Sequence, residues 1–175
     1  GKDEALKVRI DTAIALNDFY TQDGNLVSMK VNEGGFVTLV SVLCDETQRN
    51  TWKADMLITG VNRIEADPEK NINADYLVVK GAIFNFRNAI LPMEFKLTDE
   101  RGFGYFENLG ATQAEPVYTQ VWGVINCESK TTTITEESAF GEPAVRTVER
   151  KSKEWLITGT FPESKVYEFG IEETM

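Results

Sequence analysis

The stretch from Tyr76 to Phe86, YLVVKGAIFNF, has apolar residues on both of its faces. Side chains in a β-strand alternate between two faces, so residues of like parity lie together. The first face is typical of a protein core and consists of Leu77, Val79, Gly81 and Ile83. The second would be polar if it met water, yet it consists of Tyr76, Val78, Lys80, Ala82, Phe84 and Phe86. This second face is therefore a second core, a stacking platform for flat ligands, or a subunit interface.

The same period of two continues in the neighbouring segments. Further strands are predicted, in chain order, at residues 52–64, 90–97, 117–126 and 155–160. Gly60 lies inside the first of these, where a glycine indicates a bulge or a sharp bend. Residues 98–109 predict one short helix, with Thr98 as its cap and Gly110 at its end. Three strands, a short helix and two more strands form the order of an OB-fold barrel, so the predicted class is all-β with one short helix.

Three regions follow from this pattern. Residues 1–50 form an N-terminal β extension, with a strand at 7–16 and a hairpin whose turn lies at Asn32–Gly35. Residues 51–162 form the OB-like five-stranded barrel. Between its fourth and fifth strands, residues 128–153 form a long polar β-arm with its tip at 137–143. Residues 163–175 form an acidic C-terminal tail.

The composition argues against an enzyme. The chain of 175 residues contains no histidine, which removes the commonest general base and the usual zinc ligand. It has no glycine-rich phosphate loop, no HExxH and no GxSxG motif. We therefore expect no catalytic residue, no cofactor and no metal site.

Charge and hydropathy limit the partners. The net charge of −10 argues against coating nucleic acid by bulk electrostatics, but residues 144–153 carry a local net charge of +3. No apolar run approaches the ~20 residues of a membrane helix, so no membrane partner is expected. The charged start of the sequence, GKDEALKVRI, favours a cytoplasmic location over a secreted one. Cys44 and Cys127 stand in no metal or redox spacing, and the pattern leaves open whether they pair.

On an OB barrel, the outer faces of the second and third strands and the loop between the fourth and fifth strands form the ligand groove. Bases stack there on aromatic rings, and cations beside the rings follow the phosphates. The candidate groove residues are Tyr76, Lys80, Phe84, Phe86, Arg87, Lys96, Tyr118 and Trp122. The basic return strand of the arm would close over this groove with Arg146, Arg150, Lys151 and Lys153.

Each of these features also has a purely structural interpretation. The aromatic residues could pack beneath the N-terminal extension, and the arm cations could form a solvated strand face opposite Glu136 and Glu137. The tail is either a last edge strand at 166–171 or a segment that recruits partner proteins. In the second case its candidate contacts are Tyr167, Phe169, Glu172 and Glu173.

The order of elements over residues 52–160, together with the acidic aromatic end, resembles the phage-type single-stranded DNA-binding proteins built on an OB-fold. The resemblance implies sequence-tolerant binding of displaced strands in replication or recombination, with RNA as an open alternative ligand. It implies a homo-oligomer in the cytoplasm of a phage-infected or prophage-bearing bacterial cell, with replication or recombination proteins bound through the tail. The alternative function is a β-rich virion, assembly or adhesion module that uses the aromatic face as a subunit interface.

Overall fold

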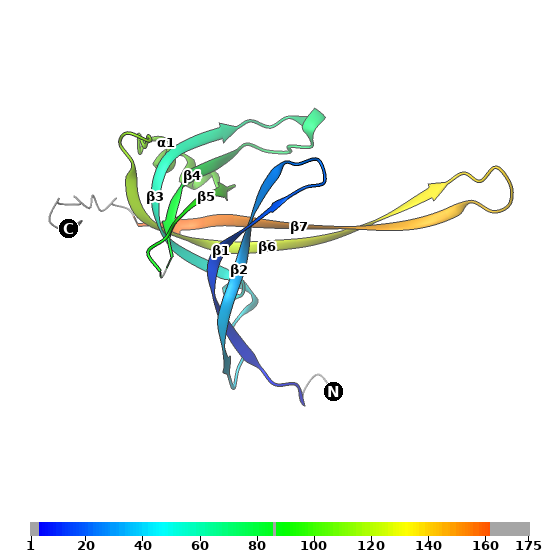
Figure 1. Ribbon diagram of the computed structural model, residues 1–175, viewed down its shortest axis with the longest axis horizontal. Helices are drawn as coiled ribbons and strands as arrows, with labels where there is room; N and C mark the ends of the chain where they lie inside the picture. Colours follow the sequence, from blue (N-terminus) through cyan, green and yellow to red (C-terminus); the bar gives the residue numbers. More distant parts are fainter. Residues whose placement is uncertain (1–3, 86, 162–175) are drawn as a thin grey trace.

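The computed structural model describes residues 4–85 and 87–161 and shows a closed five-stranded β-barrel (Figure 1). The barrel strands are β3 (Thr51–Ile64), β4 (Tyr76–Phe84), β5 (Ile90–Leu97), β6 (Val117–Glu136) and β7 (Ala144–Thr160). They follow the order β3-β4-β5-β7-β6 around the barrel, and the short helix α1 (Phe103–Glu107) connects β5 to β6. This order confirms the predicted all-β, OB-fold-like class.

The barrel core is made by the inward faces of the strands. Leu77, Val79 and Ile83 of β4 are buried, as the alternation in the sequence predicts. At one place the core is aromatic, because the rings of Trp52 and Phe95 stack with their centroids 4.2 Å apart and Trp155 packs against both. The buried rings of α1 and the remaining strands complete a core that consists of Met56, Ile58, Met93, Leu97, Phe103, Phe106, Val121 and Ile157.

Bulges and close backbone contacts allow five strands to bend into a closed barrel. The register of β3 against β4 shifts between Ile58 and Gly60, which confirms the irregularity predicted at that glycine. At Gly81 of β4 a Cβ would overlap the backbone of Leu57, and at Gly123 of β6 one would overlap the carbonyl of Leu156. Glycine is required at both positions because no side-chain atom fits there.

The N-terminal extension is a single long hairpin of β1 (Val8–Tyr20) and β2 (Leu26–Leu39). Its turn lies between these strands, so the turn predicted at Asn32–Gly35 is wrong. Gly34 and Gly35 adopt φ values of 61° and 145° and form a bulge inside β2, where the register shifts opposite Asp11 and Ala13. The glycines do take positive φ, but they use it to insert an extra residue into a continuous ladder instead of reversing the chain.

This hairpin crosses the barrel where the arm begins (Figure 1). Ile14 and Leu16 of β1 pack against the barrel core. The ammonium of Lys30 in β2 donates a hydrogen bond of 2.7 Å to the backbone carbonyl of Glu94 in β5. Nearby, the Nζ of Lys153 in β7 donates to the side chain of Asn32 at 3.1 Å. A small apolar contact and two lysine bonds thus join the extension to the barrel.

The arm is an outward continuation of β6 and β7, which leave the barrel together as a two-stranded ribbon (Figure 1). The predicted strands at 117–126 and 155–160 are therefore only the barrel ends of two much longer strands. Residues 126–147 are all exposed, and the tip lies at 137–143 as predicted.

The predicted helix over 98–109 is shorter than expected. A 3₁₀ turn at Glu100–Gly102 leads into α1, which ends at Glu107. Asp99, and not Thr98, caps this turn, since its carboxylate accepts a hydrogen bond of 3.0 Å from the backbone N–H of Arg101. Gly102 and Gly104 have low helix propensity, which accounts for the short regular segment.

Candidate nucleic-acid interface

The outward faces of β4 and β5 bring Tyr76, Lys80 and Lys96 onto one surface. Tyr76 and Lys96 are close neighbours, and the Lys96 ammonium lies 4.3 Å from the centroid of the Tyr76 ring. The same ammonium donates a hydrogen bond of 2.8 Å to the carboxylate of Glu154 in β7. This surface, which we call the groove face, therefore carries an aromatic ring with a cation held against it.

Both lysines of the groove face are already paired with carboxylates. Lys80 forms an ion pair of 3.5 Å with Glu94 of β5, and Lys96 pairs with Glu154. The four side chains are between 31% and 58% exposed, so water competes with each pair. Ion pairs of this exposure contribute about 0–1 kcal/mol.

The second face of β4 is not a buried core. Tyr76, Val78, Lys80 and Ala82 are half-buried, and Phe84 at the end of the strand is 37% exposed. Ile14 and Leu16 of the hairpin pack against the barrel core, which is the inward face of these strands. Phe86 lies outside the described residues, and the exposed Arg87 lies in the turn between β4 and β5.

Tyr118 and Trp122 are not part of the groove face. They lie on β6, which is two strands away from both β4 and β5 around the barrel. The outer faces of such strands in a five-stranded barrel point in different directions. The Trp122 ring instead lies over Gly159 and meets the Phe161 ring edge-on, with centroids 5.4 Å apart. The order of strands around the barrel, which the sequence does not display, separates them.

The arm cations divide between the two faces of the ribbon. In the register of β6 and β7, Arg146 and Arg150 lie on one face, together with Glu154. Lys151 and Lys153 lie on the other face, which is the side that Lys153 uses to reach Asn32. Because Glu154 bonds Lys96, the face with Arg146 and Arg150 continues the groove face onto the arm.

Two further residues belong to this surface that the sequence interpretation did not include. Lys130 of β6 lies directly opposite Arg150, and no ion pair of either is present in the described part of the chain. The pairing follows from a hairpin centred on the predicted tip, so the sequence did contain that signal. Lys30 borders the groove face through Glu94, and burial lowers the pKa of its ammonium while the Glu94 carboxylate opposes that shift. No local pattern marks Lys30, because its burial depends on how the hairpin docks.

The remaining expectations concern the C-terminal tail, the two cysteines, metal ligands and membrane helices. Tyr167, Phe169, Glu172 and Glu173 of the predicted partner-binding tail lie outside the described residues. Cys44 and Cys127 are both exposed free thiols. Over residues 4–85 and 87–161, there is no group of three or more side chains suited to a metal ion. None of the helices described has the length and apolarity that crossing a membrane requires.

The model of the YorF family matches residues 1–172, and the chain therefore belongs to the YorF family. No curated protein and no solved structure matches the chain.

Proposed function

We propose that this member of the YorF family binds single-stranded DNA without catalysis, in phage-type replication or recombination. The observation that carries the proposal is the groove face, where Tyr76, Lys80 and Lys96 lie on the second and third strands of an OB-fold-like barrel. That is the surface on which OB-folds bind oligonucleotides. The continuation of its cations onto the arm supplies a path for a phosphate backbone.

In this proposal the ring of Tyr76 stacks on a base. Stacking of one base on an aromatic side chain contributes about 1–3 kcal/mol and tolerates any sequence. Lys96 lies against the ring and Lys80 lies nearby on the same strand face, so both ammonium groups meet the phosphates beside the stacked base. Arg146, Arg150 and Lys130 then follow the backbone outwards along the ribbon.

Glu94 and Glu154 set a threshold for this binding. Each holds a groove lysine in an ion pair, so a ligand must exchange its phosphate for a carboxylate at both places. A polyanion makes the exchange at several lysines at once, whereas a single anion makes it at one. The acidic chain would in this way bind extended strands while having little affinity for isolated anions.

The test is a titration of labelled oligo-dT with the protein, followed by fluorescence anisotropy at ~50 and ~200 mM salt. We expect saturable binding that weakens with salt, and Tyr76→Ala should lower the affinity about 5-fold or more. Glu94→Gln and Glu154→Gln should instead raise the affinity a few-fold, because each frees a lysine without changing side-chain size.

A matched control is Asp55→Asn, which removes a carboxylate from β3 where Asp55 bonds Gln120, away from the groove face. Its affinity should stay close to that of the wild type. If neither glutamine variant strengthens binding, or if oligo-dT does not bind at high micromolar protein, the groove face is not a DNA site.

One observation favours an assembly module as the second candidate function. The N-terminal hairpin exposes many large apolar side chains on its two faces, among them Ile10, Phe36, Val37 and Leu39, and the arm tip exposes Phe140 almost fully. Apolar surface of this extent typically marks a protein interface. Sedimentation with and without oligo-dT separates the two functions, since an assembly module would associate tightly and ignore the oligonucleotide.

A further inference from the structure

The N-terminal hairpin has one face turned towards the barrel and one turned away from it. Ile14 and Leu16 of β1 pack against the barrel core, and Lys30 and Asn32 of β2 bond to residues of β5 and β7. In the register of the hairpin these four residues lie on the same face, which we call the inner face. The outer face consists of the odd-numbered residues of β1 from Arg9 to Phe19 and the residues of β2 that pair with them.

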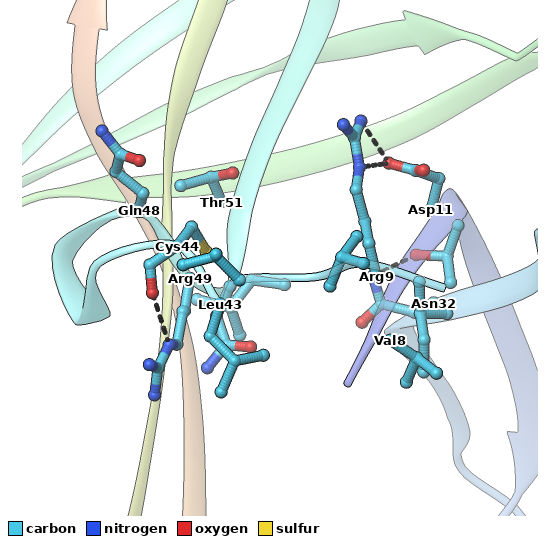
Figure 2. A pocket seen from close by; sticks show the side chains of 15 residues that line it. Val8, Arg9, Asp11, Asn32, Leu43, Cys44, Gln48, Arg49 and Thr51 are labelled. Atoms are coloured by element: carbon cyan, nitrogen blue, oxygen red, sulfur yellow. Dashed lines mark hydrogen bonds and ion pairs between the residues drawn. The ribbon is translucent and has the colours of Figure 1, made fainter. Parts of the chain in front are cut away.

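The chain itself opposes the inner face from Val8 to Leu16. Val8 and Ile10 line a cleft of about 700 Å³, whose other wall is the segment that leads into β3 (Figure 2). Arg9 and Asp11 also line this cleft, and Figure 2 shows Arg9 extended along β1 to the Asp11 carboxylate. Among the described residues, the contacts given above between hairpin and barrel all start from the inner face. A second molecule can therefore reach the centre of the outer face without meeting the barrel.

The outer face is largely apolar. Phe36 is 82% exposed, Met29 is 51% exposed and Phe19 is 40% exposed. The smaller apolar residues of this face are Ala13, Ala15, Val27 and Val31. In an antiparallel sheet with one packed face, the other face is polar when it meets water. A continuous apolar stripe in that position is typical of a protein interface.

The charge of the outer face favours a second copy of this chain as its partner. The whole chain carries a net charge of −10, so two copies repel each other over most of their surfaces. The charged residues of the outer face are only Arg9, Asp11 and Glu33, and Arg9 pairs with Asp11 at 2.8 Å. Two copies can thus approach through this face with little repulsion, whereas a strongly charged partner finds little there to attract it.

The two largest exposed side chains of the outer face are placed symmetrically along β2. Phe36 pairs with Asp11 and Met29 pairs with Asn17, so they lie at equal distances on either side of the level of Ile14. A two-fold axis at this level, parallel to the sheet and perpendicular to its strands, lays β2 of one copy over β2 of the other. Phe36 then faces Met29 of the second copy, and contacts between a thioether and an aromatic ring are favourable.

The same axis matches most of the remaining residues. On β1 it places Ala13 opposite Ala15, and Asp11 opposite Asn17, which can donate a hydrogen bond to the carboxylate. It also places Arg9 opposite Phe19, where a guanidinium can lie over the ring.

Glu33, which this axis places opposite Val31, is the exception on β2. Its side chain is exposed at an edge strand of the hairpin and can turn into water.

We propose that the outer face is a dimer interface, on which a second copy docks by its own outer face about this two-fold axis. The face is about 43 Å long and about 10 Å wide, from the 13 residues of β1 and the spacing of two strands. Two such faces bury on the order of 1,000 Å² in total, which is near the lower limit for a specific interface. The dimer should therefore be reversible, with a Kd of about 1–100 µM. This interface lies outside the groove face, so the proposal does not depend on DNA binding.

The test is sedimentation equilibrium of the full chain without DNA, from ~1 to ~300 µM protein. Phe36→Lys and Met29→Glu should each raise the Kd of the dimer about 10-fold or more, because each places an unpaired charge in the interface. Phe36→Lys also reduces the net negative charge, so repulsion between the chains does not explain its weaker dimer.

The two substitutions combined give the sharpest outcome. The axis brings Lys at position 36 of each copy against Glu at position 29 of the other, and the Kd should return to within about 3-fold of the wild type. Within one copy these positions lie about 20 Å apart along the hairpin, too far to pair with each other.

Val37→Lys is the matched control, because Val37 neighbours Phe36 and is 66% exposed but belongs to the inner face. Its Kd should stay near that of the wild type, and tryptophan fluorescence should report a folded barrel in every variant. A wild-type chain that stays monomeric at all concentrations would overturn the proposal. So would a Val37→Lys variant that dimerises as weakly as Phe36→Lys. If the combined variant does not recover, the two-fold arrangement is wrong.

Discussion

The two halves of β6 and β7 share one hydrogen-bonded ladder but differ completely in burial. In the barrel half, Val121, Trp155 and Ile157 are at most 4% exposed. In the arm half the same ladder continues to the pair Glu136 and Ala144, yet Ile134 is 38% exposed and Val145 is 66% exposed. Backbone hydrogen bonds in the folded chain replace hydrogen bonds to water, so each adds little to the free energy of unfolding. The burial of apolar side chains is the main stabilising contribution. The barrel half therefore supplies the stabilising apolar burial, whereas the side chains of the arm half stay exposed to solvent.

An isolated two-stranded ribbon is only marginally stable in water. A run of β-branched residues in β6 offsets part of this low stability. The run consists of Thr131, Thr132, Thr133, Ile134 and Thr135. These residues favour extended backbone without requiring burial. The arm can thus keep its shape while exposing nearly all of its surface.

The largest expected difference between the two regions comes from truncating one phenylalanine in each. Phe95→Ala removes a ring that is 1% exposed and stacked on Trp52, and it should lower the free energy of unfolding by about 3–5 kcal/mol. Phe140→Ala at the arm tip, where the ring is 97% exposed, should change it by less than ~0.5 kcal/mol. Urea denaturation followed by tryptophan fluorescence measures both. A comparable loss in the two variants would show that the arm packs against something in solution.

A second prediction separates the two faces of the arm. Arg146→Ala with Arg150→Ala removes two cations from the face that continues the groove, and the slope of log K against log salt for oligo-dT should fall by about 1.4. Lys151→Ala with Lys153→Ala removes the same charge from the opposite face and serves as the matched control. The slope of this control should stay near that of the wild type. If the two double variants lose equal slope, net charge and not the position of the cations controls binding.

The smallest effect concerns the exposed turn before α1 in the barrel region. Hydrogen bonds from Arg101 lower the pKa of Asp99 from 3.8 to about 2. A carboxylate with a depressed pKa contributes stability that is present above pH ~4 and is lost as the pH falls towards 2. Asp99→Asn lacks this contribution at every pH, so it should lower Tm slightly at pH 7 and reduce the further fall of Tm between pH 4 and 2. An unchanged acid limb would mean that this cap does not contribute to the stability of the barrel.

Much of the barrel was predictable because it follows from local alternation. The core face of β4 with Leu77, Val79 and Ile83, the irregularity at Gly60 and the bounds of β5 all depend on near neighbours in the chain. Such patterns reflect a single strand with one buried face, and they do not require knowledge of its partners.

The features that were not predictable depend on pairing between distant residues. Gly34 and Gly35 have the same sequence signature in a turn and in a bulge, and only the register with β1 distinguishes the two. Trp122 lies outside the predicted groove because β6 is two strands away from β4 in the closed barrel, so their outer faces point in different directions. The sequence analysis predicts one basic patch at residues 144–153, but strand alternation places its charges on both faces of the ribbon.

The seam of the barrel has a consequence for how the chain folds. β5 and β7 meet through a single parallel pair, Lys96 and Leu156, and all of α1 and the arm lie between these residues in the chain. The arm can form from its tip by pairing residues that are close in the sequence. Pairing at the seam instead closes a long loop, which costs conformational entropy, and it forms very few hydrogen bonds in return. We therefore expect the arm ladder to form early and barrel closure to come last, so that closure sets the folding rate. A longer or shorter arm would then change this rate only slightly, because the entropy of closing a loop grows slowly with its length.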